Sequence, residues 1–262
     1  MPRRFAPHLA PVISLLAVIV IGACNATPSA PPLTDPKEIL TRSVLALKDV
    51  KTMDAKGELT GTFSAQGTSM DLKGTAFEIA ADVAAKKFKA SASVPALFNT
   101  SAEAISVDQA LYYKILGPLA ASLHADPTGK YTKVDVPQSS AGPGSVAADP
   151  LKAIDDFKAM LDKLPTAPTL GPNEKVGDQD CYHVTIKLTS DQLRAMSPDQ
   201  AGSLTTPFTL NVDVWSRIND LRPAKLAFGA DGRAQGNFAV TLTMTYDTSV
   251  SIEAPSADQI AP

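Results

Sequence analysis

The side chains that could perform chemistry are few in this 262-residue chain. Beyond residue 23 the only cysteines are Cys24 and Cys181, and the only histidines are His124 and His183. Cys181 and His183 stand two residues apart in an alternating run and so share a face of a predicted strand, but no further histidine or asparagine motif accompanies them. We expect Cys181 to be a small core residue. Without ligand-spaced partners, the histidines fit surface or strand positions better than a metal site.

Sequence motifs of the common enzyme classes are absent. The chain contains no His-Glu-x-x-His, no G-x-S-x-G and no phosphate-binding loop, and Gly142-Pro143-Gly144 stops short of a dinucleotide loop. The pair Asp155 and Asp156 fits a solvated helix face, and Asp178 and Asp180 fit a turn. We therefore expect neither an enzyme nor catalytic residues, and no metal ion or cofactor.

The N-terminus has the three-part layout of an export signal. Arg3 and Arg4 precede a largely apolar stretch at 12–21, which is followed by small residues and Cys24. That stretch is shorter than the roughly 20 apolar residues that a transmembrane helix needs. Ile21-Gly22-Ala23-Cys24 resembles the bacterial lipobox, and the resemblance implies that Cys24 is acylated and becomes the mature N-terminus. An ordinary signal peptide with a chance cysteine is the alternative.

These segments define the expected domain organisation. Residues 1–23 are the predicted lipoprotein signal peptide, and 24–34 are the lipidated cysteine with a Pro/Ser/Ala-rich spacer. Residues 35–262 form a single predicted domain, which the anchor would hold at the outer face of the cell membrane. With 24 basic and 27 acidic residues and no basic block, the chain is not expected to bind nucleic acid.

Period-two alternation dominates residues 35–262. Over 53–65 every odd residue is apolar or glycine and every even one is polar, which predicts a long strand with one apolar face. Residues 66–69 turn this strand into a second one at 70–74. Further strands are expected at 88–94, 111–115, 131–136, 181–186, 208–214, 224–228 and 238–246. The pattern predicts a large antiparallel sheet of about ten strands.

A few helices interrupt the strands. Thr34 or Asp35 is the expected cap of a helix that starts at Pro36, and Asp149 the cap of a helix over 149–164. Residues 190–196 and 116–124 are shorter candidate helices, and 138–148 is a predicted loop. A sheet of this size curls, so helices on its concave side would either enclose apolar volume or fill it with their side chains. Both readings fit the composition.

The mature chain resembles the LppX/LprA/LprF/LprG lipoproteins of actinobacteria. The likeness extends over residues 35–260 in order. Its motifs are the lipobox with its spacer, the Asp35-Pro36-Lys37-Glu38-Ile39-Leu40 helix start, the strand pair at 53–76, Asp149-Pro150-Leu151, Val176-Gly177-Asp178-Gln179-Asp180, Val212-Asp213-Val214-Trp215, and Tyr246-Asp247 to Ile252-Glu253-Ala254-Pro255.

The resemblance implies an α+β fold, a U-shaped antiparallel half-barrel with helices on its concave face around an apolar cavity. It also implies a carrier of envelope lipids or lipoglycans, with an envelope lipid exporter as a candidate partner. The apolar residues expected to line the cavity are Leu59, Phe63, Leu72, Leu210, Val212, Val214, Leu226, Val240 and Leu242. The alternative is a structural or protein-binding lipoprotein with a solid core and no ligand.

Overall fold

The computed structural model describes residues 32–65, 68–118, 120–135, 150–196, 207–232 and 236–262. The chain divides into two compact units, 1–33 and 34–262, and the elements below belong to the second. No helix among the described residues is long and apolar enough to cross a bilayer. The predicted signal peptide, Cys24 and most of the spacer lie outside the described residues and stay predictions.

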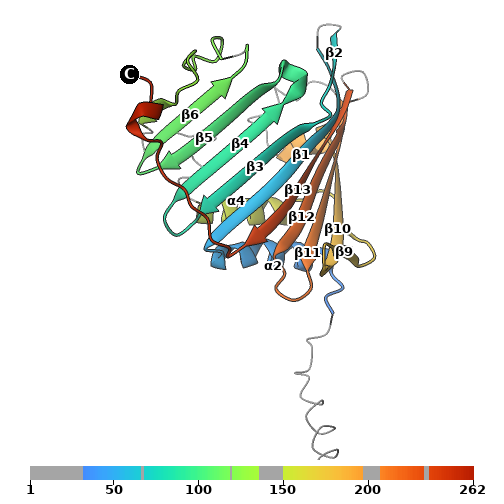
Figure 1. The fold of residues 1–262 in the computed structure, drawn as a ribbon. Helices are drawn as coiled ribbons and strands as arrows, with labels where there is room; N and C mark the ends of the chain where they lie inside the picture. Colours follow the sequence, from blue (N-terminus) through green and yellow to red (C-terminus); the bar gives the residue numbers. More distant parts are fainter. Residues whose placement is uncertain (1–31, 66–67, 119, 136–149, 197–206, 233–235) are drawn as a thin grey trace, which may run out of the picture. The chain divides into compact units, whose positions relative to one another are not determined.

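Within the described residues, thirteen strands form one antiparallel sheet, in the order β7-β6-β5-β4-β3-β1-β13-β12-β11-β10-β8, with β2 on β1 and β9 on β10 (Figure 1). The strands are β1 (Thr52–Ala65), β2 (Thr68–Asp71), β3 (Thr75–Asp82), β4 (Lys87–Val94), β5 (Thr100–Val107), β6 (Ala110–Leu116), β7 (Thr132–Asp135), β8 (Thr169–Leu170), β9 (Glu174–Val176), β10 (Gln179–Thr189), β11 (Thr209–Arg217), β12 (Pro223–Asp231) and β13 (Gly236–Tyr246).

The pairing of β1 with β13 joins two meanders into this one sheet. Its register runs from Met53 opposite Tyr246 to Phe63 opposite Gly236. The strands from β13 to β10 turn away from the plane of β3 to β6, and the sheet stays open between β7 and β8 (Figure 1). The large curled antiparallel sheet predicted from the sequence is therefore confirmed.

The alternation that predicts β1 corresponds to its burial. Ala55 and Gly57 are buried, whereas Lys56 and Glu58 are exposed. The expected count of about ten strands is too low because β3, β5 and the short β8 and β9 were not predicted. Alanine stands on both faces of β3 and serine on both faces of β5, so the hydropathy of these two strands alternates only weakly.

Helix α2 (Pro36–Ala46) begins as expected at a capped proline. The carboxylate of Asp35 accepts hydrogen bonds from the backbone N–H groups of Lys37, at 2.8 Å, and Glu38, at 3.4 Å. The buried face of α2 packs on β10 and β11 and consists of Ile39, Leu40, Ser43 and Val44. Its C-terminal end continues as η1 (Leu47–Asp49).

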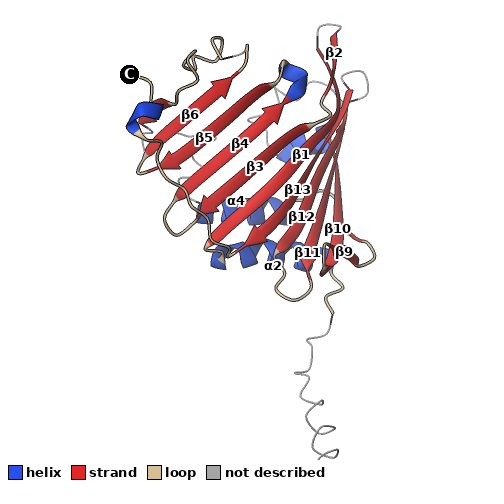
Figure 2. Cartoon of the chain, viewed as in Figure 1, coloured by secondary structure: helices blue, strands red, loops and turns tan. Residues whose placement is uncertain are grey.

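Helix α4 (Pro150–Asp162) packs on α2 and η1, and both helices lie on the same side of the sheet (Figure 2). We call this the helix-facing side and the other the outer side. Helix α5 (Ser190–Met196) confirms the prediction for 190–196. The expected cap Asp149 and the predicted loop at 138–148 lie outside the described residues.

The candidate helix at 116–124 is wrong. Strand β6 extends to Leu116, and Gly117 has a φ of +111°, which ends the strand without starting a helix. The described residues that follow form isolated turns, in which Ala120 donates to the carbonyl of Gly117 and Leu123 to that of Ala120. The apolar spacing that suggested a helix arises from the side chains of these turns.

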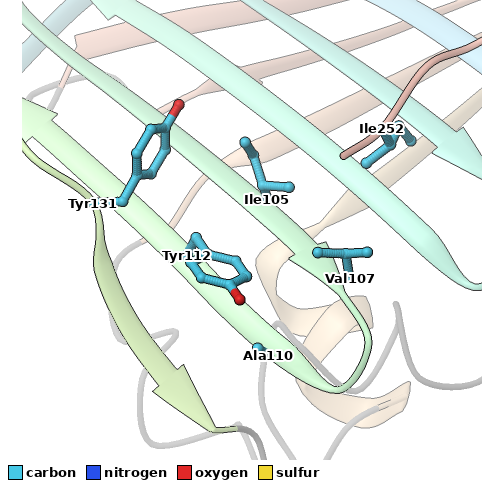
Figure 3. Packing of buried hydrophobic residues seen from close by; sticks show 6 residues of the cluster. All are labelled: Ile105, Val107, Ala110, Tyr112, Tyr131 and Ile252. Atoms are coloured by element: carbon cyan, nitrogen blue, oxygen red, sulfur yellow. The ribbon is translucent and has the colours of Figure 1, made fainter. Parts of the chain in front are cut away.

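The C-terminal segment packs on the outer side of the sheet. Ile252 joins a buried cluster with Ile105, Val107, Ala110, Tyr112 and Tyr131 (Figure 3). The backbone of Tyr131 accepts a hydrogen bond from Ala261 and donates one to Gln259, both at 2.8 Å. The short helices η2 (Pro95–Leu97) and η5 (Ala257–Gln259) complete the described elements. The sheet is thus covered on both sides, by α2 on one and by the C-terminal segment on the other.

Candidate functional site

One buried hydrogen bond identifies which side chains share the helix-facing side. The hydroxyl of Ser216 on β11 donates to that of Ser43 on α2 at 2.9 Å, so Ser216 points to the helices. Val214 and Val212 share that side, because alternate residues of a strand share a face. Directly opposed residues of antiparallel neighbours do the same. The strand register therefore extends the helix-facing side across the sheet.

That register assigns apolar side chains from eight neighbouring strands to the helix-facing side. They are Tyr182, Val184 and Ile186 on β10, Val212 and Val214 on β11, Leu226 and Phe228 on β12, Val240 and Leu242 on β13, Leu59 on β1, Phe77 and Ile79 on β3, Ala90 and Ala92 on β4, and Ala102 and Ala104 on β5. The helix-facing side is therefore apolar over most of the sheet's width.

The predicted lining residues fall into two groups by depth. Val212 and Val214, on the strand that α2 covers, are buried, with exposures of 9% and 6%. The others with described side chains are half-buried: Leu59, Leu72, Leu210, Leu226, Val240 and Leu242. Leu72 lies in the turn between β2 and β3, and the side chain of Phe63 lies outside the described residues. The structure thus brings five of the half-buried residues onto the neighbouring strands β1, β13, β12 and β11: Leu59, Val240, Leu242, Leu226 and Leu210.

Phe77, Ile79 and Phe228 also lie on this side and were missed from the sequence. Phe77 and Ile79 belong to β3, whose weak alternation hid the strand. The ring of Phe77 lies over Gly57 of β1, where an added Cβ would come within 2.2 Å of its Cζ atom. Glycine at position 57 therefore leaves room for an aromatic ring on the apolar side of the sheet.

The helices cover this apolar side in part. Ile39 and Leu40 of α2 and Leu161 of α4 are at most 2% exposed. Phe157 and Met160 on the same α4 remain 39% and 37% exposed. The packed core thus lies around α2, β10 and β11, and a second buried cluster consists of Val50, Ala55, Met244 and Tyr246, with Leu226 and Leu242 packed against it. Leu59 and Val240 are half-buried and are not part of that second cluster.

The outer side is polar between β3 and β11. Two open pockets formed by described residues, of about 630 and 350 Å³, share Ala76, Phe77 and Glu78. Their walls carry Lys56, Glu58, Glu174, Lys225 and Thr243 in one, and Ser91, Ser93, Ser101, Glu103 and Lys114 in the other. They are surface grooves of mixed charge and do not correspond to the predicted apolar cavity.

On the outer side, the carboxylate of Glu103 forms ion pairs with two lysines. Its carboxylate lies 2.8 Å from Lys89 Nζ and 3.1 Å from Lys114 Nζ. Burial alone would raise the pKa of Glu103, but hydrogen bonds from Lys89, Tyr131 and Lys114 outweigh it and lower that pKa to about 2. The ionised cluster lies beside the buried contacts that hold the C-terminal segment, which favours a structural role.

A second cluster on the outer side surrounds His183. Its ring stacks on Trp215 with centroids 4.4 Å apart, while Lys225 Nζ lies 4.3 Å from the Trp215 ring. His183 Nδ1 lies 3.0 Å from Glu174 Oε1, and Nε2 lies 2.9 Å from Asp213 Oδ1. The Trp215 N–H donates to Glu174 and, with His183, lowers the pKa of that carboxyl. Trp215 thus lies on the other face of β11 from its neighbour Val214, beside these carboxylates.

The cluster contains no catalytic pair. Cys181 shares the outer side with His183 as expected but is fully buried, and burial raises the pKa of its thiol. It packs with Trp215 and Ala224, which confirms the expected core role. The part of the chain that the structure describes holds no group of side chains suited to a metal ion. Asp155, Asp156, Asp178 and Asp180 are exposed.

The chain is similar to two solved structures, and the likeness to the first one extends to the fold. LprF from Mycobacterium bovis is 16% identical, with 86% of this chain and 99% of that chain covered and a TM-score of 0.50. The lipoprotein LppX from Mycobacterium tuberculosis is 9% identical, with coverages of 83% and 98% and a TM-score of 0.46. No protein-family model and no curated protein matches the sequence. The likeness to LprF confirms, at the level of fold, the resemblance drawn from the sequence motifs.

Proposed function

We propose that this protein is an exported lipoprotein, anchored to the cell membrane through Cys24, that binds acyl chains of envelope lipids or lipoglycans and carries them. The bound chains would lie on the helix-facing side of the sheet. The observation that carries the proposal is that Leu59 of β1 and Val240 of β13 are paired, half-buried and outside the buried cluster against which their neighbours Leu226 and Leu242 pack. The likeness of fold to LprF supports it.

The energetics of such binding need no charged motif. Transfer of an acyl chain from water to an apolar site gains about 0.8 kcal/mol per CH₂, so half-buried leucine and valine side chains can hold a long chain by contact alone. Carriage breaks no bond and so requires no nucleophile, and the Cys181 thiol is fully buried. A transfer partner, for which an envelope lipid exporter is the candidate, is part of the proposal.

The test places a tryptophan at Val240, on the helix-facing side. The matched control places it at the neighbouring Ala239, which is exposed on the outer side. Both variants are made in the Cys24→Ala chain, and binding of a fluorescent long-chain fatty acid is titrated together with a thermal melt. We expect Val240→Trp to weaken binding at least tenfold, about 1.4 kcal/mol, with a melting temperature within about 4 °C of the parent.

The control should bind the probe like the parent. A parent protein that binds no probe contradicts the proposal. So does a Val240→Trp variant that unfolds, because overpacking destabilises a filled core. Either result would favour the solid-core, protein-binding lipoprotein.

A further inference from the structure

The most exposed large apolar side chain of the described residues is an aromatic ring at one end of the sheet. Phe98, in the connection between β4 and β5, is 77% exposed. Leu116, which ends β6 opposite Ser101, is 44% exposed, and Leu123, in the turns that follow β6, is 51% exposed. We call Phe98, Leu116 and Leu123 the apolar tip. It belongs to two neighbouring connections at the end of the sheet away from α2 (Figure 2).

The backbone holds Phe98 in a conformation that is unfavourable for this residue type. Phe98 and Asn99 both have a φ of +56°, in the left-handed region that glycine and asparagine adopt more readily than phenylalanine. The Asn99 N–H donates to the carbonyl of Pro95 at 3.1 Å, and the Thr100 hydroxyl donates to the carbonyl of Leu97. Neither bond involves the Phe98 ring, so the turn does not require an aromatic side chain.

The folded domain gains little from the Phe98 side chain. An apolar side chain stabilises a fold by leaving water, and Phe98 keeps most of its surface in water. It is a member of none of the buried clusters formed by described residues around Ile105, Val50 and Cys181. A phenylalanine at this position is explained neither by the turn nor by the core, which points to a contact outside the chain.

The area of the apolar tip favours a bilayer over a protein as its partner. Its three side chains expose about 300 Å², since an aromatic side chain has about 150–250 Å² and leucine somewhat less. A stable protein interface needs roughly 800 Å² from each partner. Insertion of one aromatic ring between lipid molecules requires no surface of matching shape, because the acyl chains adapt to it.

Apolar surface continues from this end of the sheet to the proposed acyl-chain site. Leu59 stands opposite both Val240 and Thr75, and Thr75 begins β3 beside the end of β4. Phe238, near the start of β13, is 41% exposed and lies on the same side as Val240, two residues later. The half-buried residues that carry the proposed function are therefore displaced towards the end of the sheet that bears the apolar tip.

We propose that the apolar tip inserts into a lipid bilayer, with Phe98 entering the acyl-chain region, so that this end of the sheet takes up or releases the carried lipid. The inference rests on the proposed function, because a lipid carrier must contact the membrane from which its lipid leaves or into which the lipid passes.

Flotation with vesicles of equal parts dioleoyl phosphatidylcholine and dioleoyl phosphatidylglycerol measures this insertion. The full chain carrying Cys24→Ala is compared with Phe98→Asn, Phe98→Trp and Ile218→Ala in that background. Ile218 is the matched control, because it is 39% exposed in the turn between β11 and β12, at the other end of the sheet.

We expect Phe98→Asn to weaken vesicle binding about tenfold or more, because the ring supplies most of the inserted apolar area. Phe98→Trp should keep the binding of the parent, because tryptophan favours the membrane interface. Ile218→Ala should float like the parent.

Thermal melts and the fatty-acid titration separate this role from a structural one. Phe98→Asn should melt at or above the temperature of the parent, because asparagine adopts the left-handed region more readily, and should bind the fluorescent fatty acid like the parent.

The inference is overturned by a parent that does not float, by a Phe98→Asn variant that floats like the parent or melts well below it, or by an equal loss in Ile218→Ala. The proposed function then stands if the parent binds the fatty acid. A dimer of the parent that Phe98→Asn abolishes would assign the apolar tip to a second copy and also overturns the inference. A parent that floats but binds no fatty acid overturns the proposed function and leaves the insertion standing.

Discussion

The costs of truncating a fully buried leucine and a half-buried leucine to alanine distinguish an open apolar surface from a solid core. Leu40 on α2 is 2% exposed, whereas Leu59 on β1 is half-buried. Leu40→Ala should cost about 3 kcal/mol, within the 2–5 kcal/mol range for leucine in a tight core. Leu59→Ala should cost about 1 kcal/mol, because roughly half of its 1.5–3 kcal/mol of burial is realised and no closed cavity is left behind.

Urea unfolding of the lipid-free Cys24→Ala protein measures both costs. The lipid must be removed first, because any ligand that binds only the folded state adds its own stabilisation. The slope of the unfolding free energy against urea should be the same in parent and variants, so that the midpoints report stability alone. If Leu59→Ala costs as much as Leu40→Ala, the half-buried side chains belong to a filled core and the reasoning is refuted.

Three further predictions concern the charge cluster, the helix contact and the anchor. The pKa of Glu103 is about 2 in the folded protein against an ordinary 4.5, so its stabilisation is complete above pH 4.5 and is lost as the pH falls towards 2. Glu103→Gln should therefore cost about 1–2 kcal/mol at pH 7 and flatten the acid limb of a stability–pH curve. Glu78→Gln, in an exposed ion pair, should cost under about 0.5 kcal/mol in the same assay. Ser216→Ala should cost about 1–3 kcal/mol in urea, because it leaves the Ser43 hydroxyl unpaired. The double Ser43→Ala/Ser216→Ala variant should recover part of that loss, whereas a cost equal to the sum of the two single-variant costs would show that the two hydroxyls are not coupled. Cys24→Ala should move the protein from the membrane to the soluble exported fraction, and unchanged membrane attachment would refute the lipid anchor.

The sequence was most informative where one face of an element is polar. Lys56 and Glu58 alternate with Ala55 and Gly57, and this pattern identified β1 with its inward face. Strand β3 has alanine on both faces and β5 has serine on both faces, so the same reasoning missed both strands, and with β3 it missed Phe77. Periodicity reports a face only when the two faces differ in hydropathy.

The depth at which each side chain is buried, and the contacts between residues far apart in the sequence, could not be predicted from the sequence. Val214 and Val240 are both inward valines of predicted strands, yet Val214 is buried on the strand that α2 covers and Val240 is half-buried. No local pattern encodes where a helix will pack. The contact of His183 with Glu174 and Asp213 likewise depends on strand register, which aligns residues from three strands.

Mass spectrometry of the lipid that copurifies with the protein tests the central claim most directly. The Cys24→Ala chain and its Val240→Trp variant are purified from the exported fraction without detergent, and organic extracts of both are compared. The account predicts an acylated lipid in stoichiometric amount with the parent and little or none with the variant, while both melt alike. A parent that is folded and carries no lipid, or a variant that carries as much as the parent, would contradict the account.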